Sequence, residues 1–375
     1  MSNRNVVLIL SDEHSRKVVG PYGNALVRTP SLDRLAREGT VFSNAYCNSP
    51  ICVPSRASLA TGRYVHEIGC WDNAHPYDGA PPSFAHVLRD RGHACASIGK
   101  LHYRSSGAHN GFTEELLPLH VPGGEGDIQG LVRSPPVGRH PDSARHLAEE
   151  CGPGETAYQA YDRNVRDTAV EWLGSRRRGD KPWCLFVSFV SPHFPLVAPP
   201  EFFALYDPAE MPLPPLRGEG EFPDHPVLRT LRDVQDYDAY FRDADNVRLA
   251  LAAYYGMVSF LDDNIGKVLA ALDRAGLAED TLVIYASDHG DNLGTRRLWG
   301  KLNLFEESAG IPMIVRGSGI PAGRCVDVPV SLVDLFPTIV ETVTGEATQA
   351  DMPGRSLVTS ATDLSPRAAF CEYHG

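Results

Sequence analysis

Near its start the chain reads Val6-Val7-Leu8-Ile9-Leu10-Ser11-Asp12-Glu13-His14, a continuous apolar run followed at once by polar residues. An uninterrupted apolar run of this length is typical of a strand that is buried on both faces of a sheet. Runs of the same kind recur at residues 184–190, 282–286 and 312–315. The pattern therefore predicts a set of buried strands distributed along the chain.

Segments with helical spacing separate these strands, and they cover residues 30–38, 83–91, 158–173 and 250–275. Strands that alternate with helices predict an α/β fold with a mostly parallel central sheet flanked by helices. In such a sheet the ligand site lies beyond the carboxyl ends of the strands. We therefore expect functional side chains at residues 11–14, 191–193 and 287–290, which follow three of the apolar runs. Two long loops, 118–153 and 191–226, are expected to cover the substrate.

The composition is that of a soluble globular enzyme, with 42% hydrophobic and 22% charged residues. A length of 375 residues suits one large α/β domain or two smaller ones. The net charge of −12 and the lack of a long basic run argue against a nucleic-acid partner. An anionic substrate would consequently need arginine, lysine, histidine and a metal cation gathered in one pocket.

The sequence gives no sign of export or of a membrane partner. No apolar run approaches the roughly 20 residues that cross a bilayer. The run at residues 6–10 is too short, and too soon followed by Asp12, for a signal peptide. We therefore expect a cytoplasmic protein. Residues 367–375 resemble a strand that enters a loop with nothing after it, so we expect a small C-terminal subdomain to be truncated or absent.

The eight cysteines form no C-x-x-C pair, which predicts reduced and mostly buried thiols. Cys52 is followed by Val53-Pro54-Ser55-Arg56 and by a helix-forming run that ends at Gly62. Proline is favoured in the first turn of a helix, so Cys52 is expected at a helix N-terminus, where free N–H groups favour an anion. Arg56 would add positive charge about one turn later. These features alone fit a buried cysteine before an ordinary helix equally well.

The segment Cys-Val-Pro-Ser-Arg at residues 52–56 resembles the C-x-P-S-R motif of type I sulfatases, in which the cysteine is oxidised to formylglycine. Further segments similar to this family follow the family's order: Leu-Ser-Asp-Glu at 10–13, Gly-Lys-Leu-His at 99–102, Ser-Pro-His-Phe-Pro at 191–195, Ser-Asp-His-Gly at 287–290 and Gly-Lys at 300–301. The resemblance runs from residue 6 to about residue 340. It implies an alkaline-phosphatase-like three-layer sandwich, with residues 1–375 forming the sulfatase catalytic domain. Segments 99–103 and 288–294 look closest to choline sulfatases and phosphonate monoester hydrolases.

The resemblance also implies one divalent metal ion. Asp12 and Asp288 follow two separate strands, so their carboxylates can converge on a hard cation. His289 would add a nitrogen ligand, and Glu13 and the residue at position 52 complete the predicted set. Calcium is the expected ion, with manganese or magnesium as alternatives. Glu13 departs from the family, because many sulfatases have a second aspartate there and the choline-sulfatase subgroup often has glutamine.

The catalytic roles come from the same resemblance. Formylglycine made from Cys52, hydrated to a geminal diol, would be the nucleophile. His193 is expected to protonate the leaving alcohol, and His102 is expected to be the partner of the second hydroxyl. The charge on the transferring group would be stabilised by Arg56, Lys100 and Lys301. Taken singly, the two lysines also fit surface positions, and the two histidines also fit hydrogen-bonded structural positions.

The expected function is hydrolysis of a sulfate monoester, with a small anionic ester as substrate. A formylglycine-generating or other sulfatase-maturing enzyme would be a partner, and a homo-oligomer is compatible with the sequence. One alternative is a phosphonate monoester or phosphodiester hydrolase that uses the same site. Another is a non-catalytic binding protein with an unmodified Cys52. Asn73, His75 and the aromatic residues Trp71 and Tyr103 lie near the motifs, where an aromatic face would suit a quaternary ammonium leaving group.

Overall fold

An eight-stranded sheet forms the centre of the computed structural model, which describes residues 4–126, 141–218, 220–348 and 350–374. The strand order across the sheet is β11-β2-β10-β9-β1-β7-β4-β5. These strands are β1 (Asn5–Ser11), β2 (Thr40–Phe42), β4 (Cys95–Lys100), β5 (Glu114–Leu119), β7 (Cys184–Ser188), β9 (Thr281–Ser287), β10 (Met313–Arg316) and β11 (Arg324–Val326). Two short pairs lie outside the sheet: β3 (Ala45–Tyr46) with β12 (Val330–Ser331), and β6 (Gly152–Pro153) with β8 (Val197–Ala198).

The sheet is mostly parallel, as predicted. Strand β1 pairs in parallel with both β7 and β9, and β4 pairs in parallel with β7 and β5. Strand β10 is the exception, because it runs antiparallel to both of its neighbours. The carboxyl ends of β1, β4, β7 and β9 therefore meet at one edge of the sheet.

The uninterrupted apolar run of β1 is explained by two separate cores. Val7 and Ile9 belong to the hydrophobic cluster on one face of the sheet, whereas Val6, Leu8 and Leu10 belong to the cluster on the other face. Because successive side chains point to opposite faces, a strand between two cores must be apolar at every position.

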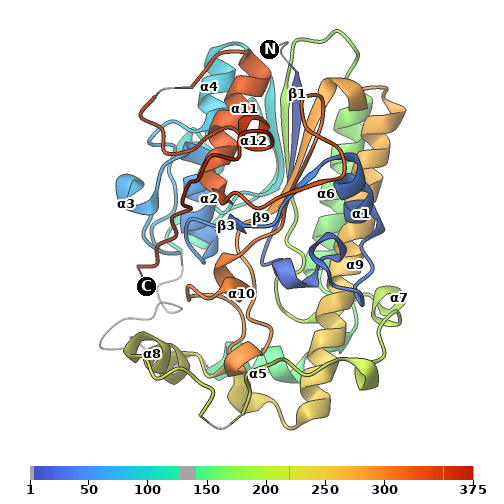
Figure 1. Ribbon diagram of the computed structural model, residues 1–375, viewed down its shortest axis with the longest axis vertical. Helices are drawn as coiled ribbons and strands as arrows, with labels where there is room; N and C mark the ends of the chain where they lie inside the picture. The colour runs from blue at the N-terminus through green and yellow to red at the C-terminus, as the bar shows by residue number, and fades with distance from the viewer. Residues whose placement is uncertain (1–3, 127–140, 219, 349, 375) are drawn as a thin grey trace.

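Helices cover both faces of the sheet, which gives the three layers that the sequence predicts (Figure 1). On one side lie α1 (Pro30–Glu38), α6 (Ala157–Gly174) and α9 (Ala244–Arg274). On the other lie α2 (Cys52–Thr61), α4 (Phe84–Asp90), α11 (Leu335–Thr344) and α12 (Leu357–Ser360). The remaining helices are α3 (Val65–Ile68), α5 (Pro141–Glu149), α7 (Pro200–Phe203), α8 (Pro226–Val234) and α10 (Glu306–Ala309).

The predicted helices are present, but α9 begins six residues before the predicted position 250. Asp243 caps its start by accepting a hydrogen bond from the backbone N–H of Asn246. The early turns of α9 pack on α5, β8 and the segment before α8, and together they form a lobe below the strand ends (Figure 1). The loops predicted at 118–153 and 191–226 contribute to this lobe and contain short elements of their own; residues 127–140 and 219 lie outside the described residues.

The prediction of a strand near residue 367 is wrong. The described residues 361–374 form no strand, because only single backbone contacts tie them to the rest of the protein. The backbone N–H of Glu372 donates to Asn48 O, and the Asn48 side chain donates to Phe370 O, both at 2.9 Å. Asn48 thus binds the segment at two points, Phe370 and Glu372, and two such contacts do not make a ladder of strand hydrogen bonds.

The cysteines are all free thiols and five of the eight are buried, as predicted. Within the described residues, none of the helices combines the length and the apolar character that crossing a membrane requires.

Candidate active site

The residues predicted to be functional follow four neighbouring strands. Asp12 follows β1, His102 follows β4, His193 follows β7, and Asp288 and His289 follow β9. The adjacent, parallel strands end at the same edge, so these side chains converge, as expected for an open α/β sheet.

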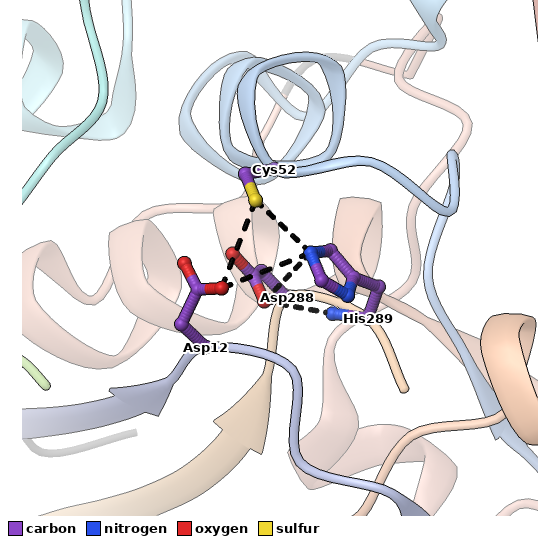
Figure 2. Close-up of side chains that lie close together, drawn as sticks. All are labelled: Asp12, Cys52, Asp288 and His289. Atoms are coloured by element: carbon purple, nitrogen blue, oxygen red, sulfur yellow. Dashed lines mark hydrogen bonds and ion pairs between the residues drawn. The ribbon is translucent and has the colours of Figure 1, made fainter. Parts of the chain in front are cut away.

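Helix α2 brings Cys52 to the same edge from the other layer. It begins at Cys52 itself, as the Pro54 position predicts. The thiol Sγ lies 3.1 Å from His289 Nε2 and 3.7 Å from Asp12 Oδ1 (Figure 2). His289 Nε2 lies 3.6 Å from Asp288 Oδ1. These four buried residues, Asp12, Cys52, Asp288 and His289, are called the floor cluster below.

The hydrogen bonds of His289 fix which ring nitrogen faces the floor cluster. Its Nδ1 lies 3.0 Å from the carbonyl oxygen of Gly290, which can only accept a hydrogen bond, so the proton is assigned to Nδ1. Nε2 is then left with a lone pair directed toward Cys52 Sγ. This is the arrangement in which metal-binding histidines are held by a neighbouring carbonyl.

Arg56 lies one turn along α2 and holds the two carboxylates of the floor cluster. Its Nε donates to Asp288 Oδ2 at 2.7 Å, and its Nη2 donates to Asp12 Oδ2 at 3.0 Å. Its Nη1 donates to Lys100 O and to Ser188 Oγ. The guanidinium is buried, and the sequence did not indicate these partners; its predicted contact with substrate oxygens stays a prediction.

Asp12 has a second cationic partner. Lys100 Nζ lies 2.6 Å from Asp12 Oδ2, and both side chains are buried. Burial acts to raise the pKa of Asp12, but the charges of Lys100 and Arg56 outweigh it and hold that pKa well below its usual value. The carboxylate is therefore ionised at neutral pH. Burial, with Asp12 beside it, raises the pKa of Cys52 to about 12, which keeps an unmodified thiol protonated.

The Glu13 carboxylate pairs with Lys301 and is not part of the floor cluster. Its Oε2 lies 2.9 Å from Lys301 Nζ and 3.4 Å from His193 Nε2. Its backbone has a positive φ of 67° and is held by Tyr254, whose hydroxyl donates to Glu13 O. Burial raises the pKa of Glu13 to about 7, although Lys301 acts to lower it. With Asp12 and His193, Glu13 forms a second group of possible metal ligands, and its predicted role as a ligand stays a prediction.

The two predicted catalytic histidines are neutral in the free protein. Burial and nearby Lys301 hold the pKa of His193 well below its usual value, and burial and Lys100 do the same for His102. His193 Nδ1 lies 2.8 Å from Phe194 O, so its Nε2 is the nitrogen that faces Glu13 and Asp12. His102 Nδ1 is buried and has no hydrogen-bond partner among the described residues.

Asp162 of α6 is a residue that sequence reasoning missed. Its two carboxylate oxygens accept hydrogen bonds from the backbone N–H groups of Val190 and Ser191, each at 2.8 Å. It thereby fixes the turn that leads from β7 to His193. Its position inside an amphipathic helix gave no signal, because a buried and a solvent-facing aspartate look alike in the sequence.

A cavity of about 370 Å³ opens above the floor cluster. Glu13, Cys52, His102, His193 and Lys301 line its inner end. Its outer wall is largely apolar or uncharged, and the lining residues include Asn73, Val121, Leu147, Phe194, Gln235, Tyr237 and Leu302.

Of the four residues expected near the leaving group, only Asn73 lines the cavity. Trp71 packs instead against His374, and Tyr103 packs against Tyr77 in the core. His75 pairs with Asp72. Trp71 and Tyr103 therefore do not provide the expected aromatic face. Among the described residues that line the cavity, Phe194 and Tyr237 have phenyl or phenol rings.

The sulfatase family model matches residues 4–345, which is most of the chain. The chain belongs to the sulfatase family. This sulfatase is 34% identical over 347 residues to the choline-sulfatase of Rhizobium meliloti, covering 90% of this chain and 67% of that protein. It is 29% identical over 395 residues to arylsulfatase K of Danio rerio, covering 99% of this chain and 72% of that protein.

Solved structures show the same architecture. The sulfatase superposes on the phosphonate monoester hydrolase of Agrobacterium radiobacter with a TM-score of 0.77 and 25% identity, covering 98% of this chain and 79% of that chain. These comparisons confirm the predicted family, the alkaline-phosphatase-like fold and the class of sulfuric ester hydrolases.

Proposed function

We propose that this sulfatase hydrolyses a sulfate monoester through a formylglycine formed from Cys52, with one divalent cation held by the floor cluster. The observation that supports this most is the convergence of Cys52 with two carboxylates and an imidazole at the base of a cavity. A small anionic ester fits the inner end of that cavity, where Lys301, His102 and His193 lie beside Cys52 in the lining. A formylglycine-generating or other sulfatase-maturing enzyme would have to act on Cys52 first.

The donor set of the floor cluster fits a divalent cation. Asp12 Oδ1 and Asp288 Oδ1 present hard oxygen ligands, and the assigned tautomer of His289 leaves Nε2 free to bind. Arg56 binds the other oxygen of each carboxylate, so both inner oxygens stay directed at the same point. Two carboxylates favour calcium or magnesium, while the nitrogen ligand also suits manganese. We propose calcium and keep the other two as alternatives.

The cation and the aldehyde would supply different chemistry. A bound divalent cation supplies Lewis-acid chemistry, and a hydrated aldehyde at position 52 supplies two hydroxyl groups, one of them a nucleophile. Lys100 and Lys301 supply fixed positive charge beside the oxygens of the ester, where charge spreads during transfer. Arg56 positions the two carboxylates, because its contacts are already made within the protein.

The two histidines differ in their surroundings. His102 is neutral, so it can accept a proton from a hydroxyl at position 52. His193 donates its Nδ1–H to Phe194 O, and a proton on Nε2 would be given to the leaving alcohol oxygen. Since its imidazole is neutral in the free protein, that proton has to be taken up together with the anionic ester, whose charge raises the pKa of His193.

A second candidate function is hydrolysis of a phosphonate monoester or phosphodiester at the same site. The structural similarity to the Agrobacterium radiobacter phosphonate monoester hydrolase favours it. Phosphorus and sulfur esters are both tetrahedral anions, so the same cations and nucleophile serve either. Kinetics on sulfate and phosphonate esters with one shared leaving group decide between them.

The Cys52→Ala substitution tests the proposal. The variant should lose turnover of an aryl sulfate while keeping its far-UV circular dichroism and its melting temperature, because a small side chain at the start of α2 is retained. Turnover within about tenfold of the parent would refute a covalent role for position 52.

A further inference from the structure

Tyr237 lines the cavity from a single turn of 3₁₀ helix, Tyr237–Tyr240, which lies between α8 and α9. A turn this short contains few backbone hydrogen bonds of its own, so its position depends on the side chains around it. The turn packs on α5, and Leu147 of that helix also lines the cavity. The place of Tyr237 in the wall is therefore set by tertiary contacts.

Asp238, the next residue, joins this turn to the loop that carries Lys301. Its Oδ1 lies 2.8 Å from Arg217 Nη2 and accepts a hydrogen bond from Trp299 Nε1 at 3.2 Å. Arg217 also donates from Nη1 to Gly294 O at 3.0 Å. Only 13% of the Asp238 side chain is exposed, so the ion pair is shielded from most of the solvent. Asp238, Arg217 and Trp299 are called the wall clasp below.

A stacked pair of rings adds to the wall clasp. Phe241 lies nearly parallel to Trp299, with ring centroids 4.4 Å apart and planes inclined by 18°. Trp299 is buried and directly precedes Gly300 and Lys301, which line the cavity. The wall clasp therefore holds together two parts of the cavity lining, the turn with Tyr237 and the loop with Lys301.

The leaving group of a bound ester must extend toward the outer wall of the cavity. The transferring group has to reach position 52, and the inner end is closed there because Asp12, Asp288 and His289 are fully buried. The carbon skeleton of the leaving group consequently points outward, where Tyr237 and several aliphatic side chains form the lining. A ring in such a wall shields the apolar surface of the leaving group from water.

We propose that Tyr237 contacts the leaving group of the ester and that Asp238 is the positioning residue that keeps Tyr237 in the wall. Together they set how tightly the cavity binds an ester with an apolar leaving group, and they do not act on the transferring anion. This inference rests on the proposed function, because it takes the transferring group to lie at Cys52.

The test separates binding of the leaving group from binding of the anion. The variants are Tyr237→Ala, Asp238→Ala and the double variant, and the substrate is 4-nitrophenyl sulfate. Inorganic sulfate is used as an inhibitor that carries the anion without a leaving group, so its inhibition constant reports on the inner end of the cavity. Asp224→Asn is the matched control, because Asp224 pairs with Arg229 of α8 at the surface of the same lobe. Circular dichroism and elemental analysis establish that fold and metal content are equal.

For Tyr237→Ala we expect KM to rise at least about tenfold, the order of loss when an apolar contact is removed from a substrate pocket. The kcat and the inhibition constant of sulfate should stay within about threefold of the parent, because the lost contact is the same in the ground state and the transition state. Tyr237→Phe keeps the ring and should keep KM within about threefold. The control Asp224→Asn should behave as the parent.

Asp238→Ala should raise KM in the same way and leave the inhibition constant of sulfate unchanged. The double variant should have a KM within about threefold of that of Tyr237→Ala, since a residue that acts through Tyr237 adds nothing once that ring is gone. Asp238→Asn, which keeps an acceptor for Trp299 Nε1, gives a milder rise and provides the same comparison if Asp238→Ala does not fold.

An unchanged KM in Tyr237→Ala would overturn the inference. So would an inhibition constant of sulfate that rises along with KM, because the substitutions would then disturb the anion site through the loop of Lys301. Rises in KM that multiply in the double variant would refute the positioning role of Asp238. Failure of the proposed function shows separately, as turnover that survives Cys52→Ala, and KM can still be compared with the inhibition constant on that turnover.

Discussion

His289 Nε2 lies 3.1 Å from Cys52 Sγ, although 237 positions separate the two residues in the chain. The contact joins the carboxyl end of β9 to the first residue of α2, and it exists because β9 ends and α2 begins at the same edge of the sheet. The imidazole offers its lone pair to the point that the thiol occupies, and the carboxylates of Asp12 and Asp288 face the same point. This arrangement is the basis of the metal prediction.

Metal removal should abolish activity. Strong chelation followed by elemental analysis should give protein without the divalent cation and without turnover, and adding the cation back should restore turnover. Asp288→Asn should weaken metal binding, because it removes one negative charge from a hard-cation site. The matched control is Asp263→Asn, which changes a carboxylate on α9 that pairs with Lys267 and should leave metal content unchanged. Full activity in protein shown to be metal-free would refute the assignment.

The loss of activity on removing His193 should depend on the leaving group of the substrate. If its Nε2 carries the proton that the leaving oxygen takes up, His193→Ala should cost about 10²–10⁴-fold on alkyl sulfates and much less on activated aryl sulfates. The measurement is the dependence of kcat/KM on leaving-group pKa, which should be steeper in the variant than in the parent. An equal loss across the series would assign His193 to binding alone, and the proton donor would then be sought at Lys301 or His102.

Asp162 should make the stability of the protein depend on pH. Burial raises its pKa from 3.8 to about 6, although hydrogen bonds from Ser191 and Val190 act to lower it. A pKa that is raised in the folded state gives a contribution to stability that is full below the unfolded pKa of about 4 and is lost as the pH rises through about 6. Between about pH 5 and pH 8 the free energy of unfolding of the parent should therefore fall by about 1–2 kcal/mol relative to Asp162→Asn.

Urea unfolding of both proteins at several pH values in this range measures the difference. Asp167→Asn on the exposed side of the same helix serves as a control, since Asp167 pairs with Arg166 at the surface. A difference between parent and Asp162→Asn that does not change with pH would show that the two backbone hydrogen bonds do not depend on the charge of Asp162.

The sequence predicted β1, β7, β9 and β10 because a strand between two cores leaves an uninterrupted apolar run, as β1 does between the clusters of Val7 and Leu8. It did not predict β2, β4, β5 and β11, the other four strands of the sheet. It predicted the location of the site because residues after parallel strands must meet at one edge. The start of α9 was placed too late, because its first turns pack on a lobe that no local pattern describes.

The partners of the site residues were much harder to predict. The C-x-P-S-R motif indicates that Arg56 belongs to the site. It does not indicate that the Arg56 guanidinium binds the carboxylates of Asp12 and Asp288. Glu13 follows Asp12 directly, yet its backbone has a positive φ and its carboxylate pairs with Lys301. Such directions are set by tertiary hydrogen bonds, as from Tyr254 to Glu13 O, and these have no signature in a single sequence.

The central claim is that catalysis needs an aldehyde at position 52, and the most direct test relates activity to aldehyde content. The protein is produced with varied amounts of a sulfatase-maturing enzyme, and the proteolytic peptide that ends at Arg56 is weighed in each preparation. Conversion replaces the thiol of Cys52 by an aldehyde, which changes the peptide mass and makes it reactive toward hydrazides. The account predicts that the specific activity on an aryl sulfate rises in proportion to the converted fraction and vanishes when only the thiol is present. Full activity in protein whose Cys52 is entirely unmodified would contradict it.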